Sequence, residues 1–160
     1  MTIAVRPARI SDAEAISRLT TELGYEAGAA LVAARLARIL DRSDQQFWMA
    51  EVDGAPAGWI HALVAEYVES EAFVMIAGLV VDSRYRRQGV GRLLLQQAEA
   101  WAKQQGCSLV RLSSSATRTA AHRFYGDVGY TNIKTQYSFV KPLDEAARER
   151  FSAFVPRVDG

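Results

Sequence analysis

The residues best suited to chemistry lie between a buried strand and a long helix, in the segment Arg84 to Arg92. Gly89 and Gly91 lack β-carbons, so their main-chain amides can approach a ligand closely. The first turn of the following helix offers unpaired N–H groups and the positive end of the helix dipole. The arginines that surround this point are Arg84, Arg86, Arg87 and Arg92. Together these features predict a binding site for a pyrophosphate.

The spacing of the glycines excludes two common nucleotide-binding loops. The segment has no Gly-Lys-Ser/Thr, which a Walker-type loop requires. A dinucleotide-binding fingerprint needs a third glycine three residues beyond Gly91, where Leu94 stands. A glycine-containing loop with solvated arginines is the structural alternative. The order of strand, basic loop, glycines and helix argues against that alternative.

Length and composition predict one ordinary globular domain. The chain has 160 residues, 49% hydrophobic and 23% charged, which excludes disordered, collagen-like and disulfide-stapled classes. We expect a single domain over 1–160, with a core of about 2–141 and a tail of 142–160. The single Cys107 has no disulfide partner within the chain, which fits a reducing cytoplasm, and we expect no metal site. The longest apolar stretch, 72–81, is too short to span a bilayer.

Hydrophobic periodicity predicts the elements that position the loop. A short strand at 2–6 precedes two helices at about 12–23 and 27–40. Strands at 47–52, 58–64 and 73–81 form a meander, with a hairpin turn at Asp53-Gly54. The rest of the order is a helix at about 90–105, a strand at 108–112, a helix at about 119–126, a strand at about 132–140 and a short tail helix within 143–154. This order predicts an α/β fold with a mixed, mostly antiparallel sheet covered by helices on both faces.

Two motifs resemble those of the GNAT superfamily of N-acetyltransferases. Arg86-Arg87-Gln88-Gly89-Val90-Gly91 is similar to the family's Arg/Gln-x-x-Gly-x-Gly/Ala signature, whose loop binds the pyrophosphate of acetyl-CoA. Ala120 to Tyr125, followed by Gly129-Tyr130, resembles the family's helix that ends in a Phe-Tyr pair before a Gly-Phe/Tyr. The resemblance covers 3–140 in element order. It implies central strands that splay apart, with Gly78 a candidate position for a bulge.

The resemblance also implies a function, which is acetyl transfer from acetyl-CoA to a primary amine by direct attack in a ternary complex. Leu79, Val80 and Val81 would present backbone groups to the pantetheine arm, as an added strand would. Tyr125 would lie near the cofactor sulfur and protonate the departing thiolate as general acid. Arg118 stands where relatives often have an asparagine that bonds the pantetheine arm. The pyrophosphate would lie on Arg86, Arg87, Gln88, Gly89, Val90, Gly91 and Arg92.

The general base and the acceptor are left open by the sequence. Many relatives place a glutamate on or near the strand 73–81, which here has no ionisable residue. His61, Glu71 and Glu26 are candidate bases, and a water chain without a single base is an equal alternative. Residues 1–80 carry 6 basic and 11 acidic side chains, a balance of −5 that is compatible with a small cationic acceptor such as a polyamine, amino sugar or amino-acid derivative. The residues that could line the acceptor site are Tyr25, Glu26, Trp59, His61, Phe73 and Met75.

Other functions stay open. One is a non-catalytic domain of the same fold that binds or senses acyl-CoA, and another is acetylation of protein N-termini or lysines. Nucleic-acid binding would require aromatic side chains among the arginines, and apart from Tyr85 they are missing there. We therefore expect a small-molecule amine as partner, and neither nucleic acid nor a membrane. Dimerisation is common in such folds, so a homodimer stays an open alternative.

Overall fold

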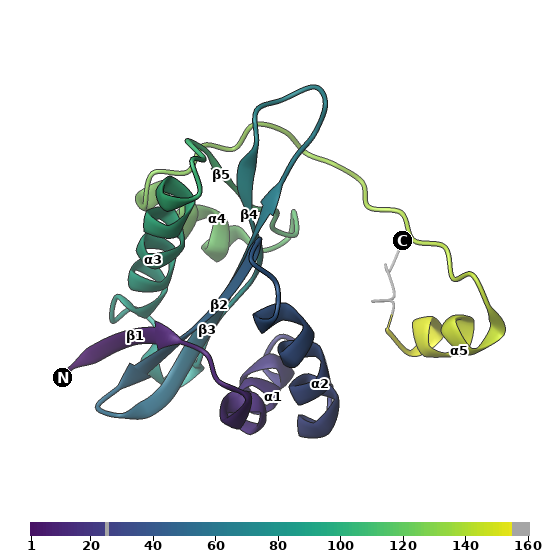
Figure 1. Cartoon of the computed structure of the whole chain (residues 1–160), viewed down its shortest axis with the longest axis horizontal. Coiled ribbons are helices and arrows are strands. Elements are labelled where there is room, and N and C mark those ends of the chain that lie inside the picture. The colour runs from purple at the N-terminus through teal and green to yellow at the C-terminus, as the bar shows by residue number, and fades with distance from the viewer. Residues whose placement is uncertain (25, 155–160) are drawn as a thin grey trace. The chain divides into compact units, whose positions relative to one another are not determined.

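The computed structural model describes residues 1–24 and 26–154 of the chain (Figure 1). The chain divides into two compact units, Met1–Ser114 and Ser115–Gly160, and each unit is described by itself. The expectation of a single domain stays a prediction. Among the described residues, no helix combines the length and the apolar composition that crossing a membrane requires.

The first unit contains a five-stranded sheet in the order β1-β2-β3-β4-β5 (Figure 1). The first four strands form an antiparallel meander, and the fifth pairs parallel to the fourth after a helical crossover. The mixed, mostly antiparallel sheet predicted from the element order is therefore confirmed. The strands are β1 (Ile3–Pro7), β2 (Gln45–Val52), β3 (Ala55–Ala65), β4 (Phe73–Val81) and β5 (Val110–Arg111).

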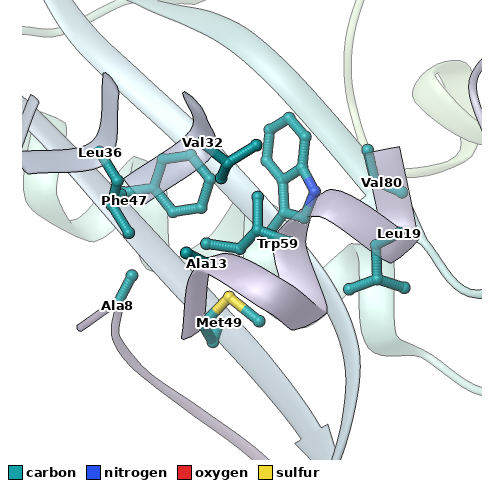
Figure 2. Close-up of a cluster of buried hydrophobic side chains, with 10 residues drawn as sticks. Ala8, Ala13, Leu19, Val32, Leu36, Phe47, Met49, Trp59 and Val80 are labelled. Atoms are coloured by element: carbon teal, nitrogen blue, oxygen red, sulfur yellow. The ribbon is translucent and has the colours of Figure 1, made fainter. Parts of the chain in front are cut away.

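Helices cover both faces of this sheet. α1 (Ala13–Thr21) and α2 (Ala29–Leu40) lie on one face, and α3 (Val90–Gln104) lies on the other (Figure 1). On the α3 face, Trp101 meets Trp48 edge to face. Burial of the apolar side of each helix against the sheet removes hydrocarbon from water and holds the layers together. The core on the α1 and α2 face includes Leu19, Val32 and Leu36 from the helices and Phe47, Met49, Trp59 and Val80 from the strands (Figure 2).

The pairing of β3 with β4 contains a bulge. The register passes from His61 opposite Gly78 to Ala62 opposite Ile76, so Ala77 is an extra residue on β4. Gly78 also allows a close approach, because a β-carbon at this position would lie 2.7 Å from the indole ring of Trp59. The bulge is therefore present one residue before the candidate position Gly78, and the absence of a side chain at Gly78 has a packing reason.

The central strands splay apart beyond the bulge. Val74 pairs with Val110 and Met75 with Arg111, and the register between β4 and β5 ends there. The remainder of β4 therefore runs along an edge without a partner strand in the described part of the first unit. This confirms the splay that the family resemblance implied.

The second unit contains α4 (Thr119–Asp127) and α5 (Glu145–Phe154), close to their predicted positions. The strand predicted at 132–140 is wrong, because the described structure has no regular element there. Tyr137 and Phe139 are 90% and 91% exposed. The local sequence favours an extended chain, but a strand forms only where its N–H and C=O groups find a partner strand. The strand predicted at 108–112 likewise shortens to the two residues that pair with β4.

Candidate active site

The segment after β4 forms a loop that contains a 3-10 turn, η2 (Ser83–Tyr85), before α3 begins. Gly89 is the N-cap of α3 and has φ +90, in the left-handed region that a glycine adopts without strain. The N–H of Leu93 donates to the Gly89 carbonyl, which leaves the amides of the three residues before Leu93 without an acceptor within the helix. These amides and the helix dipole form a local geometry that can bind an anion.

Asp82 organises this loop, although its position in the sequence did not mark it as functional. Its carboxylate is buried and accepts hydrogen bonds from the Arg84 amide at 2.9 Å and from Arg84 Nη2 at 2.8 Å. Arg18 Nη1, from α1, donates to the same carboxylate at 3.1 Å. The hydrogen bonds from Arg84 hold the pKa of Asp82 well below its usual range. The available signal was an aspartate directly after a strand, a place where its side chain often caps a turn two residues on.

We expect the variant Asp82→Ala to lose about 2 kcal/mol of unfolding free energy, because it removes a turn cap and charge-assisted hydrogen bonds. Urea denaturation at neutral pH measures this loss, with the exposed Asp41→Ala as control at less than about 0.5 kcal/mol. Because the folded pKa is depressed, the contribution of Asp82 is present above the unfolded value near 3.8 and is lost as pH falls below it. The difference between wild type and variant should therefore shrink in acid. Equal stability of the two aspartate variants at pH 7 would contradict this role.

The other arginines of the loop make fewer or longer contacts within the chain than Arg84 does. Arg86 Nε donates to the Val81 carbonyl at 3.4 Å, and its Nη2 lies 3.9 Å from Glu22 Oε2. Arg87 and Arg92 are exposed and make no ion pair with any residue that the structure describes. The positive charge available to an anion at this loop therefore comes from these three arginines, and Arg84 is held by Asp82 instead.

The free edge of β4 presents backbone groups in a regular alternation. The Asp82 N–H donates to the Ala57 carbonyl at 2.8 Å, which marks that pair as hydrogen-bonded. Bonded and non-bonded pairs alternate in an antiparallel ladder, so Leu79 and Val81 direct their N–H and C=O groups away from β3. Val80 directs its groups toward β3. An extended ligand with amide groups can bind such an edge as an added strand, which is the chemistry of a pantetheine arm.

His61 is the candidate base that the fold brings to the bulge, where it lies opposite Gly78. Its Nε2 lies 2.8 Å from Gln45 Oε1, and its ring stacks on Phe47. Burial lowers the pKa of His61, which keeps the imidazole neutral at physiological pH and able to accept a proton.

The other two candidate bases lie elsewhere. Glu71 is seven residues before Gly78, roughly 23 Å away along an extended strand. Its Oε1 accepts a hydrogen bond from Ser108 Oγ at 2.7 Å. Glu26 is exposed in the connection between α1 and α2. Glu71 is therefore remote from the bulge along β4.

The residues expected to line an acceptor site divide between core and surface. Trp59 is buried and stacks on Phe47, and its Nε1 has no hydrogen-bond partner among the described residues. Phe73 is buried at the far end of β4, under the guanidinium of Arg111. Met75 is half-buried where β4 pairs with β5. Tyr25 lies outside the described residues.

Tyr125 and Arg118 belong to the second unit. Tyr125 lies on α4, where its ring contacts the rings of Phe124 and Tyr130. Burial raises the pKa of the Tyr125 hydroxyl, so it retains its proton at neutral pH. Arg118 is the N-cap residue of α4. The roles of both residues in catalysis and cofactor binding stay predictions.

Comparison with known proteins decides the family. A model of the acetyltransferase (GNAT) family matches residues 13–130. The chain belongs to the GNAT family. This GNAT protein is 33% identical over 129 residues to the uncharacterized N-acetyltransferase YhdJ of Bacillus subtilis (strain 168), covering 80% of this chain and 87% of the relative. It is an N-acetyltransferase and therefore an acyltransferase.

Two further comparisons concern relatives of this GNAT protein that are named for aminoglycosides. It is 30% identical over 115 residues to aminoglycoside N(6')-acetyltransferase type 1 of Serratia marcescens, covering 69% of this chain and 79% of the relative. The solved structure of AAC(6')-Iy in complex with the bisubstrate analog CoA-S-monomethyl-acetylneamine has a TM-score of 0.79, covering 88% of this chain and 99% of that chain. At 20% identity, this second likeness shows the fold alone. Among the described residues of this chain, no group of three or more His, Cys, Asp or Glu side chains could hold a metal ion.

Proposed function

We propose that this GNAT enzyme transfers the acetyl group of acetyl-CoA to the primary amine of a small cationic acceptor, by direct attack within a ternary complex. The observation that carries the cofactor assignment is the left-handed Gly89 at the start of α3, followed by amides without an intrahelical acceptor. We treat 1–160 as one acetyltransferase domain. Bound acetyl-CoA would supply the activated thioester.

The cofactor would be held by two sets of groups in the first unit. The outward C=O group of Leu79 and the outward N–H and C=O groups of Val81 would bind the pantetheine arm, with the Val80 side chain packed beneath them in the core. The Leu79 N–H would also donate to the oxygen that gains charge during acetyl transfer. The pyrophosphate would lie on the segment of Arg86, Arg87, Gln88, Gly89, Val90, Gly91 and Arg92.

Proton transfer needs a base for the acceptor ammonium and an acid for the departing thiolate. His61 is the proposed base, supported by its place opposite the bulge and its lowered pKa. Tyr125 is the proposed acid, supported by the motif it shares with the family and by its raised pKa. Arg118 is kept as a proposed contact to the cofactor on the same resemblance. Glu71 becomes a weaker proposal because its separation along the strand places it far from the bulge. Glu26, in the exposed connection between α1 and α2, stays an alternative base.

We expect kcat/KM of the wild type to hold down to a pH below 6.5 and then to fall, because protonation of His61 removes the base. His61→Gln should lower kcat/KM at pH 7.5 at least about tenfold. It should also remove the fall in kcat/KM at low pH, which is the acidic limb of the pH profile. His122→Gln, at the second histidine of the chain, is the matched control and should keep both rate and limb. An unchanged rate and limb in His61→Gln would favour the water chain instead.

The cationic nature of the acceptor has two supports. The acidic balance of residues 1–80 is one, and this balance already includes Arg6, which pairs with Asp12 and Glu51. The other is that relatives of this chain are named as aminoglycoside N(6')-acetyltransferases.

A thiol-release assay across primary amines, with mass spectrometry of the products, tests the proposed function. We expect transfer to cationic amines. A preference for the version of an acceptor from which positive charges other than the reacting amine have been removed, with its other groups unchanged, would refute the acceptor class. Tight binding of acetyl-CoA without transfer to any amine would favour the non-catalytic acyl-CoA-binding alternative.

A further inference from the structure

A basic hollow lies on the α2 side of the first unit, apart from the pyrophosphate loop. It measures about 510 Å³ and is lined by Arg35, Arg38, Ile39, Arg42 and Gln45. Arg35 and Arg38 are three residues apart on α2, which places them on one side of the helix, and Arg42 follows two residues after the helix ends.

The charge in this hollow is only partly neutralised by the chain. Arg42 makes two hydrogen bonds to Asp44, from Nε at 2.8 Å and from Nη2 at 2.9 Å. Arg35 and Arg38 are exposed and make no ion pair within the described part of the chain. Two guanidinium groups therefore face the hollow with their donors available, and guanidinium binds carboxylate and phosphate in a matching fork geometry.

Two side chains in series, Gln45 and His61, link the hollow to the bulge. Gln45 lines the hollow, and its Oε1 lies 2.8 Å from Nε2 of His61. His61 in turn lies opposite Gly78 at the bulge. Gln45 pairs with Leu63, two residues along β3 from His61, so hollow and bulge are separated by roughly 10 Å.

We propose that this hollow binds an anionic group, a carboxylate or a phosphate, carried by the same acceptor whose amine reacts at the bulge. The inference rests on the proposed function and narrows the chemical class of its acceptor. The acceptor would carry its reacting ammonium group and an anion roughly 10 Å away, about the reach of three extended residues, which favours a short peptide-like amine with a carboxylate or phosphate over a polyamine.

Anion binding is tested first, without any acceptor. Inorganic phosphate is titrated into CoA-saturated protein, so that the pyrophosphate loop is already filled, and the arginine Nε–H NMR signals are followed. We expect saturable shifts in the wild type and at least a tenfold weaker affinity in the double variant Arg35→Gln/Arg38→Gln. The control Arg148→Gln/Arg150→Gln removes the same charge from α5 and should bind phosphate as the wild type does. Equal phosphate affinity in both double variants would overturn the proposal.

Matched acceptors then test whether the anion belongs to the substrate. Gly-Gly-Gly is compared with its C-terminal amide, and Gly-Gly-phosphoserine amide with Gly-Gly-Ser amide, so that the two pairs separate carboxylate from phosphate. We expect the anionic member of at least one pair to have a KM at least tenfold lower, and this preference to vanish in Arg35→Gln/Arg38→Gln. A preference that survives in the variant, or equal KM values in both pairs, would refute the inference while the acetyltransferase activity stands. Transfer to no amine at all would instead refute the proposed function. The phosphate titration would still test whether the hollow binds an anion.

Discussion

Replacing Gly89 by valine should raise the Kd for CoA about 100-fold, which corresponds to about 2.7 kcal/mol of binding free energy. Gly89 has φ +90, a conformation that a β-branched residue adopts only with strain. The N-cap would shift to relieve this strain and carry the first-turn amides away from the pyrophosphate. A valine side chain at the mouth of the loop would also block close approach of the phosphates. Calorimetric titration with CoA measures the change.

The same helix provides a matched control for this experiment. Gly106 follows the C-terminal end of α3 and has φ +79, and a β-carbon added there would, as at Gly89, meet no atom within 4 Å. Gly106→Val should therefore lose similar folding stability without changing the affinity for CoA. Thermal denaturation of both variants separates strain from binding. Wild-type affinity in Gly89→Val would mean that the cofactor does not lie at the start of α3.

Replacing Tyr125 by phenylalanine should lower kcat about 100-fold, because the departing thiolate loses its proposed proton donor. The substitution removes one oxygen and keeps the ring that contacts Phe124 and Tyr130, so the packing of α4 should change little. Burial raises the pKa of this hydroxyl, so the wild type should remain active across the neutral range without a limb from Tyr125. Steady-state kinetics with a saturating amine measure the change in kcat.

A second tyrosine in the same unit controls for loss of a hydroxyl. Tyr137 is 90% exposed, and Tyr137→Phe should leave kcat and the Kd for CoA unchanged. The Kd for CoA should also change less than threefold in Tyr125→Phe if the hydroxyl acts on the leaving group and not on cofactor binding. A kcat within threefold of the wild type in Tyr125→Phe would remove this residue from the mechanism.

Features with a local cause were predictable from the sequence. Asp53 and Gly54 both adopt positive φ in the hairpin between β2 and β3, as their residue types predict. Gly106 ends α3 because a left-handed residue closes a helix at little cost. The loop before α3 was predictable for the same reason, since its glycine and helix N-terminus lie within a few residues of each other. The family match over 13–130 confirms the assignment based on that loop.

The residues that meet across the sheet depend on strand register, which only the tertiary structure decided. Three candidate bases were equal in the sequence, and the pairing of His61 with Gly78 distinguishes one of them. Phe73 could have lined a site, yet its place at the far end of β4 makes it a core residue.

The same distinction between local preference and long-range contact separates the family motif from the residues that support it. The sequence alone determined the element order, the turn glycines and the family motif, because periodicity and backbone preference act over a few neighbouring residues. Only the tertiary structure showed that Arg18 on α1 donates to Asp82, and that the segment 132–140 lacks a partner strand in the described chain. Both depend on groups brought from distant parts of the chain, and local preference carries no information about which groups will meet.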